Sequence, residues 1–176
     1  KVCLSAITLD FGGGTKSTVQ VLKGGRARKL ERTDVRLGME FEPGDRLISS
    51  GDSAVAELSC PKATSMKFHG RFVVVILPVQ DGQDCAVNLL DGNLDVLTSE
   101  ETQSKAGDIT LGSKHTEYAV RMVHGEGNRP VPEAFVYDGE VEVTAEGTSY
   151  PVTSGSMFQR QTLNVRKIEA AEFDRA

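Results

Sequence analysis

Residues 134–143, Ala-Phe-Val-Tyr-Asp-Gly-Glu-Val-Glu-Val, contain the pattern on which the fold prediction depends. Polar and apolar residues alternate through Val141 and Val143, as they do along a strand with one buried face. The pair Asp138-Gly139 interrupts this pattern with a hairpin signal, because glycine tolerates the positive φ that tight turns need. The same combination of alternating residues and glycine turns recurs along the chain and predicts an all-β fold.

Alternation of this kind predicts four further half-buried strands, at residues 18–22, 54–58, 94–96 and 118–122. Turn residues separate the apolar runs, and they include Lys23-Gly24-Gly25, Pro43-Gly44-Asp45, Gly51-Asp52 and Asp91-Gly92-Asn93. The only helix that the pattern supports is a short amphipathic one within residues 165–175. The expected architecture is an antiparallel β-sandwich or a twisted, β-solenoid-like sheet built from repeated hairpins.

Internal similarity suggests two β halves. Residues 19–24, 87–92 and 134–139 share an apolar strand that ends in a charged residue and glycine. Gly44-Asp45 and Gly107-Asp108 each precede, at the same distance, a Ser or Thr and a further strand. This recurrence has two alternative explanations, a duplicated β unit or the sequence pattern that β-hairpins generally share. We expect an N-terminal arm at 1–17, a first half at 18–79, a second half at 80–164 and a tail or short helix at 165–176.

Composition excludes several classes of function. The 176 residues carry a net charge of −5, 39% of them are apolar, and tryptophan is absent. Residues 23–32 hold five basic side chains, which we interpret as a solvated hairpin and not as a nucleic-acid-binding surface. No apolar run approaches the ~20 residues that span a bilayer. The chain begins at Lys1 and not at Met, so we expect an upstream segment to have been removed.

Three cysteines, Cys3, Cys60 and Cys85, occur without a CxxC motif or an adjacent histidine. One disulfide and one free thiol would fit an oxidising compartment, whereas three buried thiols would fit a cytoplasm. The favoured pair is Cys60 and Cys85. A disulfide between them would close a loop in the chain and stabilise the folded state by roughly 3 kcal/mol. Cys3 would then be left over for a bond to a partner chain.

The residues give no pattern typical of a catalytic, cofactor or metal site. The glycine-rich segment 9–17 resembles a phosphate loop of actin-like ATPases, but we interpret it as a flexible turn or arm because the remaining loops of such enzymes are missing. His69, His115 and His124 lack metal-ligand spacing, although His115 and His124 could approach each other across a sheet. Glu140 and Glu142 alternate with valines and are expected on one solvated face.

One apolar segment has two possible roles. Phe72, Val73, Val74, Val75, Ile76 and Leu77 form an uncharged, β-branched run. Such a strand must either lie in the centre of a sheet or pair at an edge with a second chain. Edge pairing would build a dimer or a filament.

At these turn and strand residues the sequence resembles the FecR-type domain, a β-rich module of bacterial envelope proteins. The resemblance covers residues 18–159. It rests on Pro43-Gly44-Asp45-Arg46-Leu47-Ile48-Ser49 and the following strand, and on Gly107-Asp108, residues 116–121, residues 136–143 and Val152-x-x-Gly155.

The resemblance implies an extracytoplasmic domain, periplasmic, at the cell surface or secreted, without catalytic residues or a cofactor. In signalling members this domain receives a contact from an outer-membrane transporter and restrains a sigma factor through a separate cytoplasmic segment. In other members it resembles an interaction or scaffold module. We therefore expect a non-enzymatic structural or protein-binding function, with a protein partner or with copies of itself. The alternatives are a sensor domain and a glycan- or peptidoglycan-binding domain that uses Tyr118, Tyr137 and Tyr150.

Overall fold

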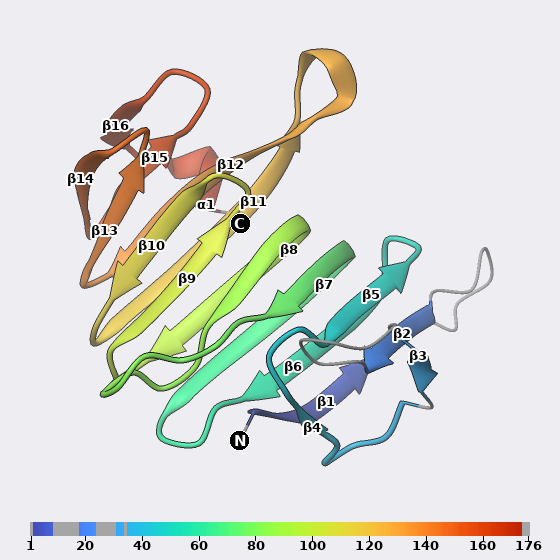
Figure 1. The fold of residues 1–176 in the computed structure, drawn as a ribbon. Coiled ribbons are helices and arrows are strands. Elements are labelled where there is room, and N and C mark those ends of the chain that lie inside the picture. The colour runs from blue at the N-terminus through green and yellow to red at the C-terminus, as the bar shows by residue number, and fades with distance from the viewer. Residues whose placement is uncertain (1, 9–17, 24–30, 34, 174–176) are drawn as a thin grey trace.

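A computed structural model of the chain describes residues 2–8, 18–23, 31–33 and 35–173 (Figure 1). Within this part almost every element is a strand, which confirms the predicted all-β class. The strands are β1 (Val2–Thr8), β2 (Thr18–Lys23), β3 (Glu31–Thr33), β4 (Glu40–Phe41), β5 (Arg46–Ser50), β6 (Val55–Ser59), β7 (Thr64–Ile76), β8 (Val87–Thr98), β9 (Thr102–Ala106), β10 (Ile109–Ser113), β11 (Thr116–His124), β12 (Pro130–Asp138), β13 (Glu140–Ala145), β14 (Thr148–Thr153), β15 (Ser156–Gln159) and β16 (Asn164–Lys167). A 3-10 turn, η1 (Glu126–Asn128), and a helix, α1 (Ala170–Phe173), complete it.

The hydrogen-bonded strands fold into two layers over one core. The first layer has the order β4, β1, β6, the first half of β7, the second half of β8, β11, β12, β15 and β16. The second has the order β3, β2, β5, the second half of β7, the first half of β8, β9, β10, β13 and β14. Of the two expected architectures, this arrangement is the antiparallel sandwich, with β8 and β9 as its parallel pair.

Two long strands belong to both layers because each bends at a glycine. β7 bends at Gly70, with φ +77°, and β8 bends at Gly92, with φ +94°. A Cβ atom at Gly92 would lie only 2.6 Å from Cβ of Phe72. The two strands can approach each other this closely only because residue 92 has no side chain. Strands that change sheets through such bends form the corners of a sandwich.

The Asp-Gly pairs at 91–92 and 138–139 are therefore not the hairpin turns that the sequence predicted. Gly92 lies inside β8, and Gly139 joins β12 in the first layer to β13 in the second. In both cases the strands on either side pair with different neighbours. The alternating apolar residues face the same core from opposite layers, and the glycine supplies the change of direction between them.

The core fills the space between the layers. Its largest fully buried side chains include Phe68 and Phe72, whose ring centroids lie 5.8 Å apart, and Tyr118. At the far end the ring of Tyr150, on β14, lies 5.0 Å from the ring of Phe158, on β15, and so joins the layers. Burial raises the pKa of the Tyr118 hydroxyl and keeps this residue neutral.

The apolar run 72–77 occupies a central position. The second half of β7 pairs with β5 on one side and with β8 on the other, and Phe72, Val74 and Ile76 are buried. Leu77 follows the strand and donates its N–H to the carbonyl of Ala86. Phe72, Val73, Val74, Val75, Ile76 and Leu77 therefore offer no free edge to a second chain, which corrects the edge-pairing alternative. The neighbouring strands β5 and β8 use the backbone groups that such pairing needs.

One end of the second layer is protected against strand addition. β14 pairs with β13 along its whole length and forms that end of the layer. Pro151 lies in the middle of β14, opposite Glu142. Proline has no N–H to donate, and edge strands use it to discourage pairing with other chains.

The two Gly-Asp turns have different environments. The Asp45 side chain is buried and accepts hydrogen bonds from Nζ of Lys23 and, at 2.8 Å, from the backbone N–H of Glu42. The Asp108 side chain is exposed and receives Arg160, with the closest pair of atoms 2.7 Å apart. The hydrogen bond from Arg160 lowers the pKa of Asp108. The repeated sequence motif thus fixes a core turn in one place and a surface ion pair in the other.

We expect Asp45→Ala to destabilise the fold by about 2 kcal/mol, because it leaves a backbone N–H and an ammonium group without their buried acceptor. The matched change Asp108→Ala should cost less than about 1 kcal/mol, because exposed ion pairs contribute little. Urea unfolding of the two variants measures both values. Equal losses would show that the burial of Asp45 has no energetic consequence.

The C-terminal segment covers part of the outer face of the first layer. Residues 164–167 form β16 and complete a hairpin with β15, so Val165 lies in a strand and the expected helix is confined to Ala170–Phe173. Buried Ile168 packs against a small outer cluster of Ala119, Phe135 and Met157. The Arg166 guanidinium binds both carboxylate oxygens of Glu172, at 2.6 and 2.9 Å.

The hydrogen bonds from Arg166 lower the pKa of Glu172 from 4.5 to about 2, helped by the backbone N–H of Glu169. A carboxyl group with a lowered pKa stabilises the folded state above its unfolded pKa and loses this effect as the pH falls. We therefore expect the segment around Ile168 to loosen between about pH 4.5 and pH 2. Amide hydrogen exchange at Ile168 measures the change. In Glu172→Gln the segment should already be loosened at neutral pH and should respond little to acid.

Candidate functional site

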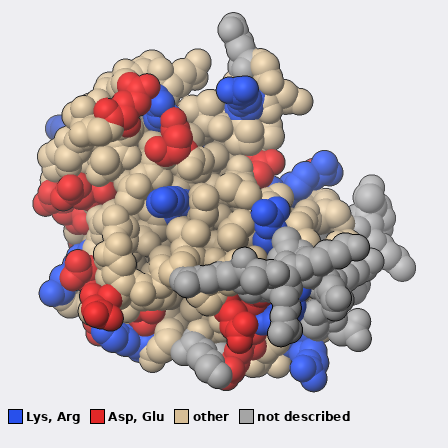
Figure 2. All heavy atoms as spheres, in the orientation of Figure 1, with Lys and Arg blue, Asp and Glu red and all other residues tan. Residues whose placement is uncertain are grey.

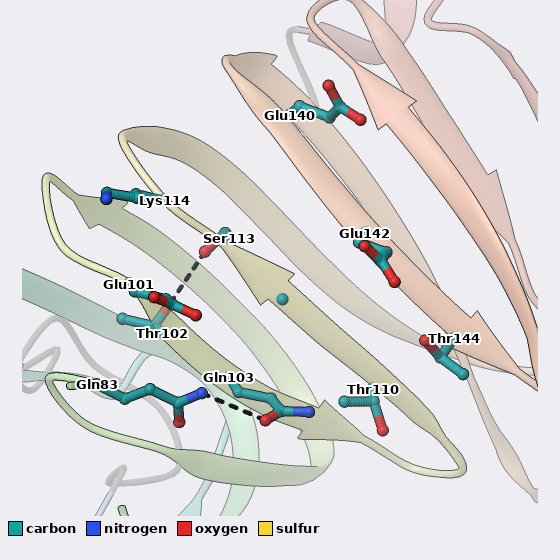
Figure 3. A pocket seen from close by; sticks show the side chains of 11 residues that line it. Gln83, Glu101, Thr102, Gln103, Thr110, Ser113, Lys114, Glu140, Glu142 and Thr144 are labelled. Atoms are coloured by element: carbon teal, nitrogen blue, oxygen red, sulfur yellow. Dashed lines mark hydrogen bonds between the residues drawn. The ribbon is translucent and has the colours of Figure 1, made fainter. Parts of the chain in front are cut away.

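A polar trough of about 550 Å³ lies on the outer face of the second layer (Figure 3). Three neighbouring strands form its floor, and Gln103 of β9, Gly112 of β10 and Glu142 of β13 stand side by side in one row. Thr110 and Thr144 occupy the next row. The alternation of each strand turns these positions outward, while their neighbours enter the core.

Gly112 makes the trough deep at its centre. The position has no side chain, and a Cβ atom placed there would meet only the carbonyl oxygen of Glu142, at 3.9 Å. Its φ lies outside the left-handed region, so the backbone accepts other residues. A larger side chain at this position would therefore fill the trough without straining the fold.

The lining gives the trough a negative and strongly polar character. Glu101, Glu140 and Glu142 contribute carboxylates, and Lys114 is the basic residue among the lining side chains. The amide of Gln83 donates to the amide oxygen of Gln103 at 3.3 Å, which ties the loop before β8 to β9. Such a surface can accept hydrogen bonds and attract Lys or Arg side chains.

Glu140 and Glu142 are both exposed, as the alternation in β13 predicted. Acid–base catalysis by two carboxyl groups needs environments that separate their pKa values. These two side chains share one open face, so the arrangement favours binding over proton transfer. On the face shown in Figure 2, basic side chains are scattered among acidic ones and do not form a stripe for a phosphate backbone.

Cys60 and Cys85 form a disulfide, with Cα atoms 5.8 Å apart. The carboxylate of buried Asp84 accepts the backbone N–H groups of Lys62 and Ala63, at 2.8 and 3.1 Å. These contacts join the turn after β6 to the segment before β8. Both sulfur atoms are used in this bond, so the group Cys60, Asp84 and Cys85 lacks free thiolates for a metal ion. Cys3 lies in β1, and its side chain is outside the described part.

The histidines do not come together. His115 precedes β11 and His124 ends it, so the extended strand holds them roughly 30 Å apart. This corrects the expectation that they could approach each other across a sheet. Two of the histidines contact a carboxylate instead. Nε2 of His69 lies 3.2 Å from Asp95, and Nε2 of His124 lies 2.8 Å from Asp91.

Two further expectations from the sequence concern the glycine-rich segment and membrane-spanning helices. The glycine-rich motif at 9–17 lies outside the described residues. Among the helices of the described part, none has the length and apolar character needed to cross a bilayer.

The trough was not predicted from the sequence beyond Glu140 and Glu142. The outward positions of Gln103, Thr110 and Gly112 could have been found by alternation, but their adjacency depends on the pairing of β10 with β13.

Comparison with known proteins identifies the fold. No family model matches the chain, and no curated protein matches it in sequence. Two crystal structures of candidate anti-sigma factors from Parabacteroides distasonis are similar in fold. The first, at 2.50 Å resolution, has a TM-score of 0.54 and 11% identity, and the match covers 70% of this chain and 59% of that one. The second, at 1.65 Å resolution, has a TM-score of 0.52 and 10% identity, with coverage of 68% and 57%.

This chain thus shares its β architecture with structures of the anti-sigma-factor type. It spans less than two thirds of the length of either of those chains. At 10% and 11% identity the likeness concerns the fold, and functional residues have to be argued from this chain's own side chains.

Proposed function

We propose that the chain is a non-enzymatic, extracytoplasmic protein-binding domain of the bacterial cell envelope, similar to FecR-type domains and acting as a sensor or interaction module. The observation that carries this proposal is the fold shared with two candidate anti-sigma factors. Anti-sigma factors act by binding other proteins. The motifs at Gly44-Asp45 and Gly107-Asp108, on which the resemblance to FecR-type domains rests, form the turn before β5 and the turn between β9 and β10.

Two features of the chain support this proposal. The disulfide between Cys60 and Cys85 fits an oxidising compartment, where such bonds persist. The trough offers an open, preformed surface with carboxylates and amides, and polar rims of this kind are typical of protein interfaces. We assign the trough as the binding surface, with Thr110 and Gly112 at its floor.

In-cell photocrosslinking tests the proposal. A photoreactive p-benzoylphenylalanine replaces Thr110 in the trough and, as a control, Arg129 in the exposed loop after β11. We expect a discrete adduct with one envelope protein from position 110 and none from position 129. The variant Gly112→Val should reduce this adduct by about tenfold, because the valine side chain fills the site. Identical adducts at both positions, or none at either, would contradict the proposal.

Glycan binding is a second candidate function, favoured by the amide, hydroxyl and carboxylate groups that line the trough. Retention of the purified protein on isolated peptidoglycan tests it. Retention that Gly112→Val abolishes would favour glycan binding over protein binding. Tyr118, one of the tyrosines expected to hold a sugar ring, is fully buried and is not available for this role.

Assembly of the chain with itself remains part of the proposal and has its own measurement. The central position of β7 and Pro151 in β14 leave less edge for strand exchange than the sequence suggested. Light scattering across a concentration series would show discrete oligomers if copies associate through other surfaces. A constant monomer mass would restrict the function to binding a different protein.

A further inference from the structure

A second hollow, of about 470 Å³, opens at the end of the sandwich near the disulfide. Its lining comes from both layers and from the segment after β7. The apolar part includes Phe41 of β4, Pro61, Ile76 at the end of β7, Leu77 and Val79. Unlike the trough, this pocket exposes mainly apolar surface, and its volume is in the range of known binding cavities.

The far wall of the pocket is fixed by covalent and polar bonds. Pro61 follows Cys60 in the chain, and Asp84 precedes Cys85, so the disulfide holds these two lining residues in place. The hydrogen bonds from Lys62 and Ala63 to Asp84 connect the same two segments. This wall is therefore formed before anything binds, which lowers the entropic cost of binding.

The near wall is also held in place. Nζ of Lys23 donates to buried Asp45 and, at 2.7 Å, to the carbonyl oxygen of Glu40. The same ammonium group lies 5.5 Å from the centre of the Phe41 ring. These contacts orient Phe41 at the pocket and use the charge of Lys23, the one basic side chain among the described lining residues, to balance Asp45.

The rim of the pocket carries negative charge. Glu40 and Glu42 are exposed on either side of Phe41. Lys23 is paired with Asp45, so among the described lining residues no free ammonium group balances the carboxylate of Glu42. A cation would be attracted, and charge complementarity of this kind selects partners and speeds their association.

We infer that this pocket receives an aliphatic or aromatic side chain of a partner protein, carried next to a Lys or Arg that faces Glu42. The inference rests on the proposed protein-binding function and names a second contact site, separate from the trough. An apolar anchor in a preformed pocket, surrounded by a charged rim, is the usual arrangement of an interface hot spot. Val79 forms the outer lip and is 43% exposed, so a partner can cover it.

Titration with short peptides tests the inference. The probe is the capped peptide Gly-Arg-Leu-Lys-Gly, compared with Gly-Glu-Leu-Glu-Gly and Gly-Arg-Ser-Lys-Gly. Methyl NMR of the oxidised chain follows Ile76, Leu77 and Val79. We expect the first peptide to shift these signals with a Kd near or below about 1 mM and the other two to bind at least about tenfold more weakly.

Matched variants locate the binding. Val79→Asn should weaken the first peptide about tenfold, whereas Val123→Asn, at a valine of similar exposure on β11, should change its Kd less than about twofold. Glu42→Lys should reverse the preference, so that the peptide with two glutamates binds better. Replacing both Cys60 and Cys85 by serine should weaken binding as the wall loosens.

Several results would overturn the inference. These are an absence of methyl shifts, equal binding of all three peptides, an equal effect of the two valine variants, or tight binding of neutral isobutanol without any charge dependence. None of them would affect crosslinking from position 110, which tests the proposed function separately. Loss of that crosslinking with intact peptide binding would instead leave the pocket and remove the trough.

Discussion

Gly92→Ala is expected to lower the free energy of unfolding by about 3 to 4 kcal/mol. An alanine with φ near +94° is strained by roughly 1–2 kcal/mol. Its Cβ atom would in addition lie 2.6 Å from Cβ and 2.7 Å from Cα of Phe72, so β7 would have to move, and crowding of this kind costs about 1–3 kcal/mol. Thermal unfolding should show a midpoint lowered by about 10 °C.

Two other glycines provide controls for this effect. Gly147 also has a positive φ, +77°, but a Cβ atom there would meet nothing within 4 Å, so Gly147→Ala should cost only about 1 kcal/mol. Gly112→Ala lacks both problems and should be neutral or slightly stabilising, by up to about 1 kcal/mol. A cost at Gly92 no larger than the cost at Gly147 would show that β7 and β8 do not cross as closely as described.

Removal of the disulfide is expected to destabilise the domain by about 3 kcal/mol. Cys60 and Cys85 are separated by 25 residues, and a closed loop of this length restricts the unfolded chain by roughly that amount. The double variant Cys60→Ser, Cys85→Ser should therefore unfold at lower urea concentration. Both side chains are buried, Cys60 just after β6 and Cys85 just before β8, and the serine hydroxyls would add to the loss.

Reducing the wild-type chain separates the contribution of the covalent bond from that of the buried serine hydroxyls. The wild-type chain in dithiothreitol should approach the stability of the double variant, whereas Cys3→Ser should respond to dithiothreitol in the same way as the wild type. An unchanged midpoint on reduction would show that the pocket wall at Pro61 and Asp84 holds without the covalent bond. The same measurement would then weaken the case for an oxidising compartment.

Much of the fold could be predicted because alternation is a local property. The runs around Val19, Ala56, Val96 and Val143 became strands with one buried face. The run around Val120 became a strand that is buried on both faces, because Ala119 lies in the outer cluster with Ile168. The change of layer at Gly92 and Gly139 could not be predicted, because it depends on which distant strand each half pairs with. The same Asp-Gly pair is typical of a hairpin when its flanking strands pair with each other and of a corner when they do not.

The candidate site was harder to predict than the fold. Alternation alone placed Glu140 and Glu142 on a solvated face. It did not bring Gln103 and Gly112 beside them, because β11 and β12 separate β10 from β13 in the chain. The pocket at Phe41 depends on contacts between still more distant segments, near residues 23, 41, 61 and 79.

The paths of β7 and β8 have a consequence for how the domain responds to load. Since each strand is hydrogen-bonded in both layers, the two layers cannot separate from each other while these strands stay paired. A force applied to one layer is therefore carried by the other as well, and mechanical unfolding should occur in a single step that begins near Gly70 and Gly92. Under tension the domain would then behave as one stiff body until both layers unfold together.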